Sequence, residues 1–324
     1  MAAQSRAGGV FRCNFQWWRQ LPRCDARNVC SLFFRTLLMK PLALLPSILL
    51  LALCTRAITP RSLAAMPEII NVSAYDPTEK QRSGVSYSEH DVSALRASGA
   101  SGLIARAGKG GNLDEKCATF LASADRAGML PGIYYRLQNQ VDAVTQADQF
   151  ISRAQSLAGS RAWTAPSLLL CADFDANSRL SDILRFKERV ETRTGVVPVA
   201  YLENSTHLKQ LLGSADAATK AKLRQMPYWL ALYAHDSGAG PDYPAPGSPG
   251  GLVKQYRVWP DWALWQYAGV DWERGRSRPK VYSHGSNRFP LYFGKINRPL
   301  ERNVFNGSLA SLQAFWQRHG LKLK

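Results

Sequence analysis

Cysteine, histidine and long apolar runs are scarce in this sequence, and each scarcity excludes a class of protein. Of the 6 Cys, only Cys117 and Cys171 follow residue 65, which excludes a disulfide-built scaffold. The 5 His include no pair four residues apart that would bind zinc from a helix, and a Gly-Lys-Ser/Thr phosphate loop is missing. We therefore expect no metal and no cofactor.

The longest largely apolar run, residues 42–53, is too short to span a bilayer comfortably. It follows Lys40 and precedes the small residues Ser62 and Ala64, which is the layout of a secretory signal peptide. We expect residues 1–65 to form a leader with its h-region at 42–53 and Met39 as an alternative start. The protein is then exported to the periplasm, cell envelope or medium, and an uncleaved leader that anchors it to the membrane is the alternative.

Basic residues exceed acidic ones. The sequence has 41 Lys and Arg against 24 Asp and Glu; the first 65 residues hold nine basic and one acidic residue, so 32 and 23 remain beyond them. A basic exported protein favours a polyanionic partner such as an envelope glycan, although the excess charge could serve solubility alone. We expect no nucleic-acid partner, because no recognition module is present, and we expect a monomer.

Apolar strand-like segments alternate with helical ones over about 250 residues. This alternation predicts a single parallel (β/α) barrel domain over residues 66–324. Three helices are predicted to stop at glycines: 114–127 at Gly128, 146–158 at Gly159 and 180–194 at Gly195. The predicted strands are 69–72, 102–106, 130–136, 167–174, 198–202, 228–233 and 263–267.

The segment SLLLCADFDAN, residues 167–177, is the most informative one. A buried strand ends there in Asp173 and Asp175, and alternation along the strand directs both carboxylates to one face, with Cα atoms roughly 6–7 Å apart. Two crowded acids do not ionise independently, so we expect one raised pKa, as acid-assisted cleavage of a glycosidic bond requires. The alternative is that these acids cap the next helix or pair with a basic neighbour.

Other predicted strands also end in side chains suited to sugars. In a barrel these ends converge on one site, where aromatic rings stack on sugars and polar tips form hydrogen bonds. The convergence favours a carbohydrate site. The residues, besides the two acids, are Asn71, Arg106, Tyr134, Tyr135, Arg136, Tyr201, Tyr233, Gln266 and Tyr267.

Several segments, taken in order over residues 68–317, resemble a glycoside hydrolase family 25 lysozyme. They include INVSAYD, LLLCADFD, TGVVPVAYLENS, ALWQYAG and the closing RPLERNVFNGSLASLQAFW. The resemblance implies an irregular, TIM-like (β/α) barrel and an exported muramidase. Its substrate is then the β-1,4 bond between N-acetylmuramic acid and N-acetylglucosamine in peptidoglycan.

The sequence departs from the family pattern at its acids. The first-strand Asp of the family falls on Asn71, its D-x-E pair on Asp173 and Asp175, and its late Asp on Glu301. The resemblance implies Asp175 as general acid and retention of configuration. It implies that Asp173 stabilises the oxocarbenium-like centre or positions the substrate's own acetamido oxygen for attack. It also implies that Asn71 and Glu301 orient that pair. The alternatives are a glycan-binding pseudoenzyme and a glycosidase for another acetamido or acidic polysaccharide.

The family's Tyr-His pair after the third strand is matched here by Tyr134 and Tyr135. We expect both of these tyrosines to form subsite walls, together with Tyr201, Tyr233 and Tyr267. We expect Arg106 and Gln266 to bind substrate as well.

Overall fold

The computed structural model describes residues 66–76, 88–232, 248–268, 270–271, 280–281 and 300–324. All of them belong to one compact unit, Thr59–Lys324. The predicted leader and Tyr233 lie outside the described residues. Within these ranges, none of the helices combines the length and the apolar character that a membrane span requires.

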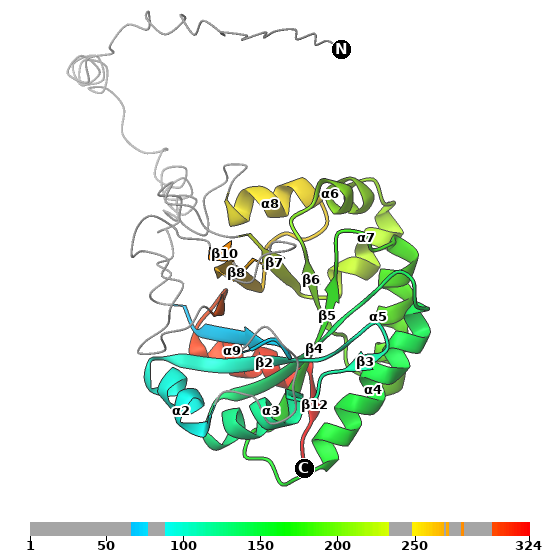
Figure 1. Ribbon diagram of the computed structural model, residues 1–324. Helices are drawn as coiled ribbons and strands as arrows, with labels where there is room; N and C mark the ends of the chain where they lie inside the picture. Colours follow the sequence, from blue (N-terminus) through cyan, green and yellow to red (C-terminus); the bar gives the residue numbers. More distant parts are fainter. Residues whose placement is uncertain (1–65, 77–87, 233–247, 269, 272–279, 282–299) are drawn as a thin grey trace, which may run out of the picture. The chain divides into compact units, whose positions relative to one another are not determined.

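Eight strands close into a barrel (Figure 1). Around the barrel the order is β1 (Glu68–Val72), β11 (Glu301–Phe305), β8 (Leu264–Ala268), β7 (Tyr228–Ala231), β6 (Val199–Leu202), β5 (Ser167–Phe174), β4 (Leu130–Arg136) and β2 (Ala100–Lys109), and β2 pairs back with β1. The predicted fold class, an irregular TIM-like (β/α) barrel, is confirmed.

One strand corrects the expectation of a wholly parallel barrel. Strand β11 runs antiparallel to both of its neighbours, β1 and β8, whereas the other barrel pairs are parallel. Because its direction is reversed, its first residue, Glu301, lies beside Asn71 near the carboxyl end of β1. The reversal therefore brings Glu301 to the rim where the parallel strands end.

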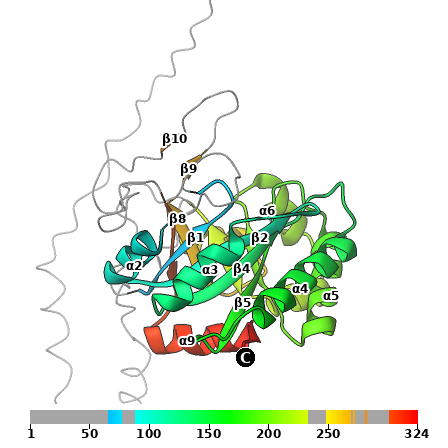
Figure 2. The same cartoon turned by 60° about the horizontal axis from the view of Figure 1, so that its bottom comes forward.

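Helices cover the outside of the sheet (Figure 1). They are α2 (Glu89–Ala97), α3 (Cys117–Arg126), α4 (Ala143–Gly159), α5 (Leu180–Thr194), α6 (Thr206–Gly213), α7 (Ala217–Arg224) and α8 (Pro249–Tyr256). The short strands β3 (Asn112–Leu113) and β12 (Gly320–Lys322) pair with β2 and β5, and β9 (Val270–Asp271) pairs with β10 (Lys280–Val281). Helix α9 (Leu309–Arg318) lies beneath the barrel in Figure 2.

Local signals account for most helix bounds. Helix α5 has its predicted bounds, and Gly128 and Gly195 adopt left-handed φ angles of +70° and +72° at the helix ends, as glycine readily does. Helix α4 begins three residues before the predicted start, because the Asp142 side chain accepts hydrogen bonds from the first-turn amides. Gly159 is the last residue of α4 rather than the residue after it.

Alternation along the strands sorts side chains into two clusters. One lies between sheet and helices. The other fills the barrel interior and comprises Ile69, Ile104, Tyr134, Leu169, Cys171, Val199, Trp229, Leu264 and Phe305 from the strands, with Leu312 and Trp316 from α9. Helix α9 therefore fills the interior at the end opposite the carboxyl ends of the strands. The polar residues of the interior lie towards those carboxyl ends.

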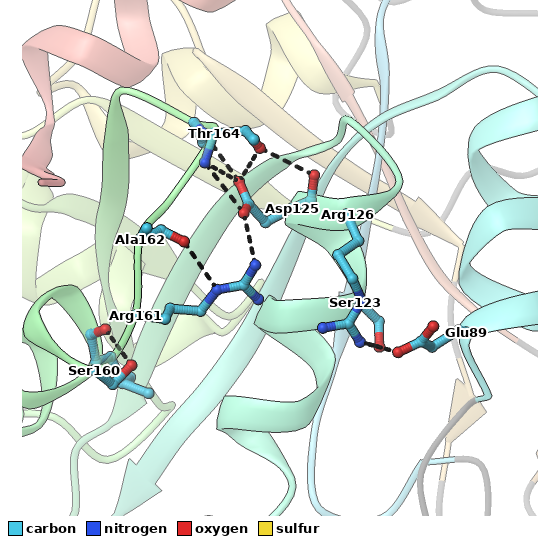
Figure 3. Close-up of polar contacts among 10 residues, drawn as sticks. Glu89, Ser123, Asp125, Arg126, Ser160, Arg161, Ala162 and Thr164 are labelled. Carbon is cyan, nitrogen blue, oxygen red and sulfur yellow. Dashed lines mark hydrogen bonds and ion pairs between the residues drawn. The ribbon is translucent and has the colours of Figure 1, made fainter.

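A buried aspartate fixes the chain just before β5, the strand that carries Asp173. Figure 3 shows Asp125 at the end of α3, where its carboxylate accepts a hydrogen bond from the Thr164 hydroxyl (2.6 Å). It also accepts the amide of Ala165 (2.9 Å) and pairs with Arg161 (3.2 Å). These contacts satisfy a carboxylate that would otherwise be costly to bury, and they tie α3 to the segment that enters β5.

Candidate active site

A pocket opens at the carboxyl ends of the barrel strands and encloses about 60 Å³, the space of about two water molecules. In a (β/α) barrel this end carries the functional groups. The lining holds three carboxylates, one guanidinium, two amides and three aromatic rings. These residues are Asn71, Tyr134, Arg136, Asp173, Tyr201, Glu203, Trp229, Gln266 and Glu301.

Asp173 is the most deeply buried carboxylate of the pocket. Its side chain is 6% exposed, and no described residue forms a hydrogen bond with its Oδ1 atom. Burial raises the pKa of Asp173 to about 7, with further contributions from the Glu203 and Asp175 carboxylates and an opposing one from Arg136. The sequence predicted one raised pKa at this pair of acids, and Asp173 is the residue that carries it. A carboxyl group of this kind can donate a proton near neutral pH.

Asn71 links the opposite wall of the pocket into one hydrogen-bond network. Its amide nitrogen donates to Glu301, and its Oδ1 atom accepts from Gln266 (3.1 Å) and Asn303 (2.8 Å). Tyr201 in turn donates to Gln266 (2.9 Å). An aspartate at position 71 would have no N–H to offer Glu301 and would add a second charge beside it. The amide therefore suits the longer acid at position 301.

Glu301 provides a pH-dependent test of this wall. Burial, with a smaller contribution from the nearby Asp76 carboxylate, raises the pKa of Glu301 to about 8. Between about pH 4.5 and pH 8, the Glu301 carboxyl group is ionised in the unfolded chain but still protonated in the folded one. Its contribution to folding stability therefore falls over this range and is constant above about pH 8. A tenfold change in proton affinity is worth about 1.4 kcal/mol, so ionising the buried group costs the folded state a few kcal/mol.

Glu301→Gln is therefore expected to raise the thermal midpoint at about pH 9 and to leave it nearly unchanged at about pH 4. Thermal unfolding followed by circular dichroism across this range measures the difference. Glu115→Gln, at an exposed position, is the control and should have no effect at either pH. A Glu301→Gln variant that is equally stabilised at both pH values would contradict the titration of Glu301.

Seven residues singled out from the sequence meet in the pocket: Asn71, Tyr134, Arg136, Asp173, Tyr201, Gln266 and Glu301. Arg106 lies close enough to influence the pKa of Asp173, but its guanidinium forms a buried ion pair with Asp114 (2.8 Å). Asp175 is not among the described residues that line the pocket. Its carboxylate accepts the amide of Asn177 (2.9 Å) and so caps the turn after β5, which is close to the capping alternative drawn from the sequence.

Tyr135 and Tyr267 lie elsewhere, which corrects their predicted place in the subsite walls. Tyr135 is fully buried on the outer face of β4, packs against Phe150 and donates to Gln149 (2.8 Å). Tyr267 lies on the outer face of β8 and donates to Glu68 (2.7 Å). Each follows an inward residue, and consecutive side chains of a strand point to opposite faces.

The predicted site omitted Trp229 and Glu203, and underrated Arg136. Trp229 lies inside β7 rather than at its end, and its indole N–H donates to Asn303 (2.8 Å). Glu203 follows β6 by one residue, and the alternation that directs Tyr201 inward also directs Glu203 inward. Extending the strand pattern by one residue would have found it. Arg136 pairs with Glu203 at 3.1 Å.

Across the described part of the chain, no three His, Cys, Asp or Glu side chains are grouped so as to hold a metal ion. Cys117 and Cys171 are buried and unbonded to each other. Burial raises the pKa of both thiols, which keeps them protonated. The chemistry of the pocket thus rests on its carboxylates, Arg136 and the polar network.

Comparisons with known proteins identify a family and a similar fold. The family model for glycosyl hydrolases family 25 matches residues 84–275. The chain is similar to the bacterial lysozyme from Streptomyces coelicolor, with 20% identity and a TM-score of 0.52 over 79% of this chain and 99% of that chain. It is also similar to a muramidase from Acremonium alcalophilum (17% identity, TM-score 0.49, 78% and 99% covered). Among curated protein sequences, none matches it.

Proposed function

We propose that this chain, which belongs to glycosyl hydrolases family 25, hydrolyses the β-1,4 bond between N-acetylmuramic acid and N-acetylglucosamine in peptidoglycan. The main supporting observation is the buried carboxyl group of Asp173, whose pKa of about 7 suits proton transfer at neutral pH. It faces a pocket at the end of the barrel where the family's chemistry would be expected.

The surroundings of Asp173 support a glycan substrate. Tyr134 and Tyr201 both pack edge-on against Trp229, which sets three aromatic rings around the carboxyl group. Aromatic faces stack on sugar rings, while the amides of Asn71 and Gln266 can orient an acetamido group. The resemblance to the family also makes retention of configuration part of the proposal. The resemblance implies Asp175 as proton donor, but that carboxylate caps the turn after β5, so we assign the role to Asp173.

We further propose that the protein acts outside the cytoplasm as a monomer, with peptidoglycan as its polyanionic partner. The signal-peptide-like run at 42–53 and the basic excess beyond residue 65 support this location. No other partner is needed by the mechanism.

Product analysis tests the proposed bond. The full-length protein is incubated with purified peptidoglycan, new reducing ends are reduced with borohydride, and the alditols are identified after acid hydrolysis. Muramitol is expected, because cleavage after N-acetylmuramic acid leaves that sugar at the reducing end. Glucosaminitol would place the cut at the other bond. Peptidoglycan that is bound but releases neither alditol would favour the glycan-binding pseudoenzyme instead.

A further inference from the structure

Glu203 lies two residues after Tyr201, the residue of β6 that pairs with Asp173. In the β5–β6 register, Asp173 pairs with Tyr201, so Asp175 and Glu203 are the corresponding residues one step beyond the strands. The backbone at Glu203 is held in place, because Tyr256 donates its hydroxyl to the Glu203 carbonyl (2.7 Å). The structure thus offers two candidates, just after the neighbouring strands β5 and β6, for a second carboxylate beside Asp173.

Only one of these candidates faces the pocket. Asp175 turns its carboxylate to the amide of Asn177, and its carbonyl accepts the amide of Ser178 (3.1 Å). Glu203 lines the pocket together with Asp173, and its side chain is one methylene longer. Glu203 also contributes more than Asp175 to the raised pKa of Asp173. The carboxylate that acts on Asp173 most strongly is therefore Glu203, which follows β6.

The two pocket acids make different contacts. One Glu203 oxygen pairs with the Arg136 guanidinium (3.1 Å), and the other accepts the backbone amide of Ala176 (3.3 Å). Both Glu203 oxygens thus accept hydrogen bonds from protein donors. Asp173 Oδ1 has no such donor within the described residues and is buried, which favours the neutral acid. Paired acids in contrasting environments divide the roles of proton donor and anion.

We propose that Asp173 and Glu203, rather than Asp173 and Asp175, are the two catalytic carboxylates. This inference rests on the proposed function. Asp173 transfers its proton to the glycosidic oxygen as the bond to the anomeric carbon breaks, and the bonding electron pair leaves with that oxygen. Glu203 stabilises the positive charge that develops on the anomeric carbon. A water molecule then adds to the anomeric carbon from the side that the leaving oxygen occupied and returns a proton to Asp173. This step restores the enzyme and gives a product with retained configuration.

The alternative role for Glu203 is structural, because its contacts join the loops that follow β4, β5 and β6. Two readouts separate the roles in the full-length protein. The first is kcat/KM for reducing-end release from purified peptidoglycan, measured for wild type, Glu203→Gln, Glu203→Asp and Asp175→Asn. The second is a carboxyl carbon-13 NMR titration of Asp173, which does not depend on turnover.

We expect Glu203→Gln to lower kcat/KM by about a hundredfold or more, with partial recovery in Glu203→Asp, while Asp175→Asn stays within about tenfold of wild type. The pKa of Asp173 should fall further in Glu203→Gln than in Asp175→Asn, because Glu203 makes the larger contribution to raising it. Sedimentation with insoluble peptidoglycan and the thermal midpoint should change little in Glu203→Gln. A purely structural role would lower these two together with the rate.

The possible failures are distinguishable. Active wild type whose Asp175→Asn variant loses as much activity as Glu203→Gln, or more, would overturn the role of Glu203 and leave the proposed function intact. An Asp173 titration that is insensitive to Glu203→Gln would also overturn the pairing. Wild type that releases no reducing ends would overturn the proposed function, and with it the catalytic role of Glu203.

Discussion

Asp173→Asn is expected to reduce the release of reducing ends from peptidoglycan by about a thousandfold. The amide has nearly the shape of the carboxyl group but has no proton to donate to the leaving oxygen, and general acid catalysis is worth about 10²–10⁴ in rate. The pKa of Asp173 is also shifted by Arg136, on β4, and by Glu203, which follows β6. Loss of the Asp173 carboxyl group therefore removes the group on which these charges act.

The pH dependence of wild type gives the same assignment a second test. A carboxyl group with a pKa of about 7 holds its proton below that pH and loses it above. As a proton donor, Asp173 should therefore make kcat/KM fall as pH rises beyond about 7, and this alkaline limb reports the free enzyme. The residual activity of Asp173→Asn should lack that limb.

Stability separates loss of chemistry from loss of fold. Ionising the buried Asp173 destabilises the native state, so stability attributable to this group falls from about pH 4 to about pH 7. Asp173→Asn should thus unfold at the same temperature as wild type near pH 4 and no lower at pH 8. Glu188→Gln, on the exposed side of α5, is the control for removal of a charge. An Asp173→Asn variant with wild-type turnover would refute the role of Asp173.

The strand pattern predicted the inward direction of Asp173 and the convergence of polar strand ends, because both depend on local alternation. The same rule, applied to each pair, would have excluded Tyr135 and Tyr267, which follow inward residues. These errors arose from grouping adjacent residues at strand ends as one site. The order of strands and helices predicted a (β/α) barrel, and the resemblance made it an irregular one, but neither predicted the reversed direction of β11.

The choice between Asp175 and Glu203 could not be made from local pattern. It depends on the turn after β5, where the Asn177 amide donates a hydrogen bond to the Asp175 carboxylate. It also depends on Arg136, on β4, which forms an ion pair with Glu203. The contact between Asn71 and Glu301 joins residues 230 positions apart and depends on the reversed direction of β11. Non-local contacts of this kind decide which of several candidate acids share one pocket.

Trp316 of α9 is the largest side chain that this helix contributes to the barrel interior. Its indole is fully buried among the interior residues, and its N–H donates to the Pro131 carbonyl (2.6 Å). A Cβ atom on Gly102 or Gly132 would lie 3.3 Å from this ring, so the two glycines leave the space that the indole occupies. The ring thus fills the barrel from the end opposite the catalytic pocket.

Trp316→Ala is accordingly expected to lower the free energy of unfolding by about 3–5 kcal/mol, the usual cost of removing a buried tryptophan. In a domain of this size that corresponds to a fall on the order of 10 °C in the thermal midpoint. Leu309→Ala removes an apolar side chain from the same helix, but at a position that is 51% exposed, and should cost less than about 1 kcal/mol.

Trp316→Phe separates two contributions of this residue. It retains an aromatic ring but loses the hydrogen bond to Pro131, so an intermediate loss is expected. Chemical denaturation at constant pH measures all three variants. If Trp316→Ala were no less stable than Leu309→Ala, the indole would not support the barrel. Trp316 and Asp173 lie at opposite ends of the interior. Substitution of Trp316 should therefore lower the free energy of unfolding at any pH, whereas substitution of Asp173 should mainly lower the rate of turnover.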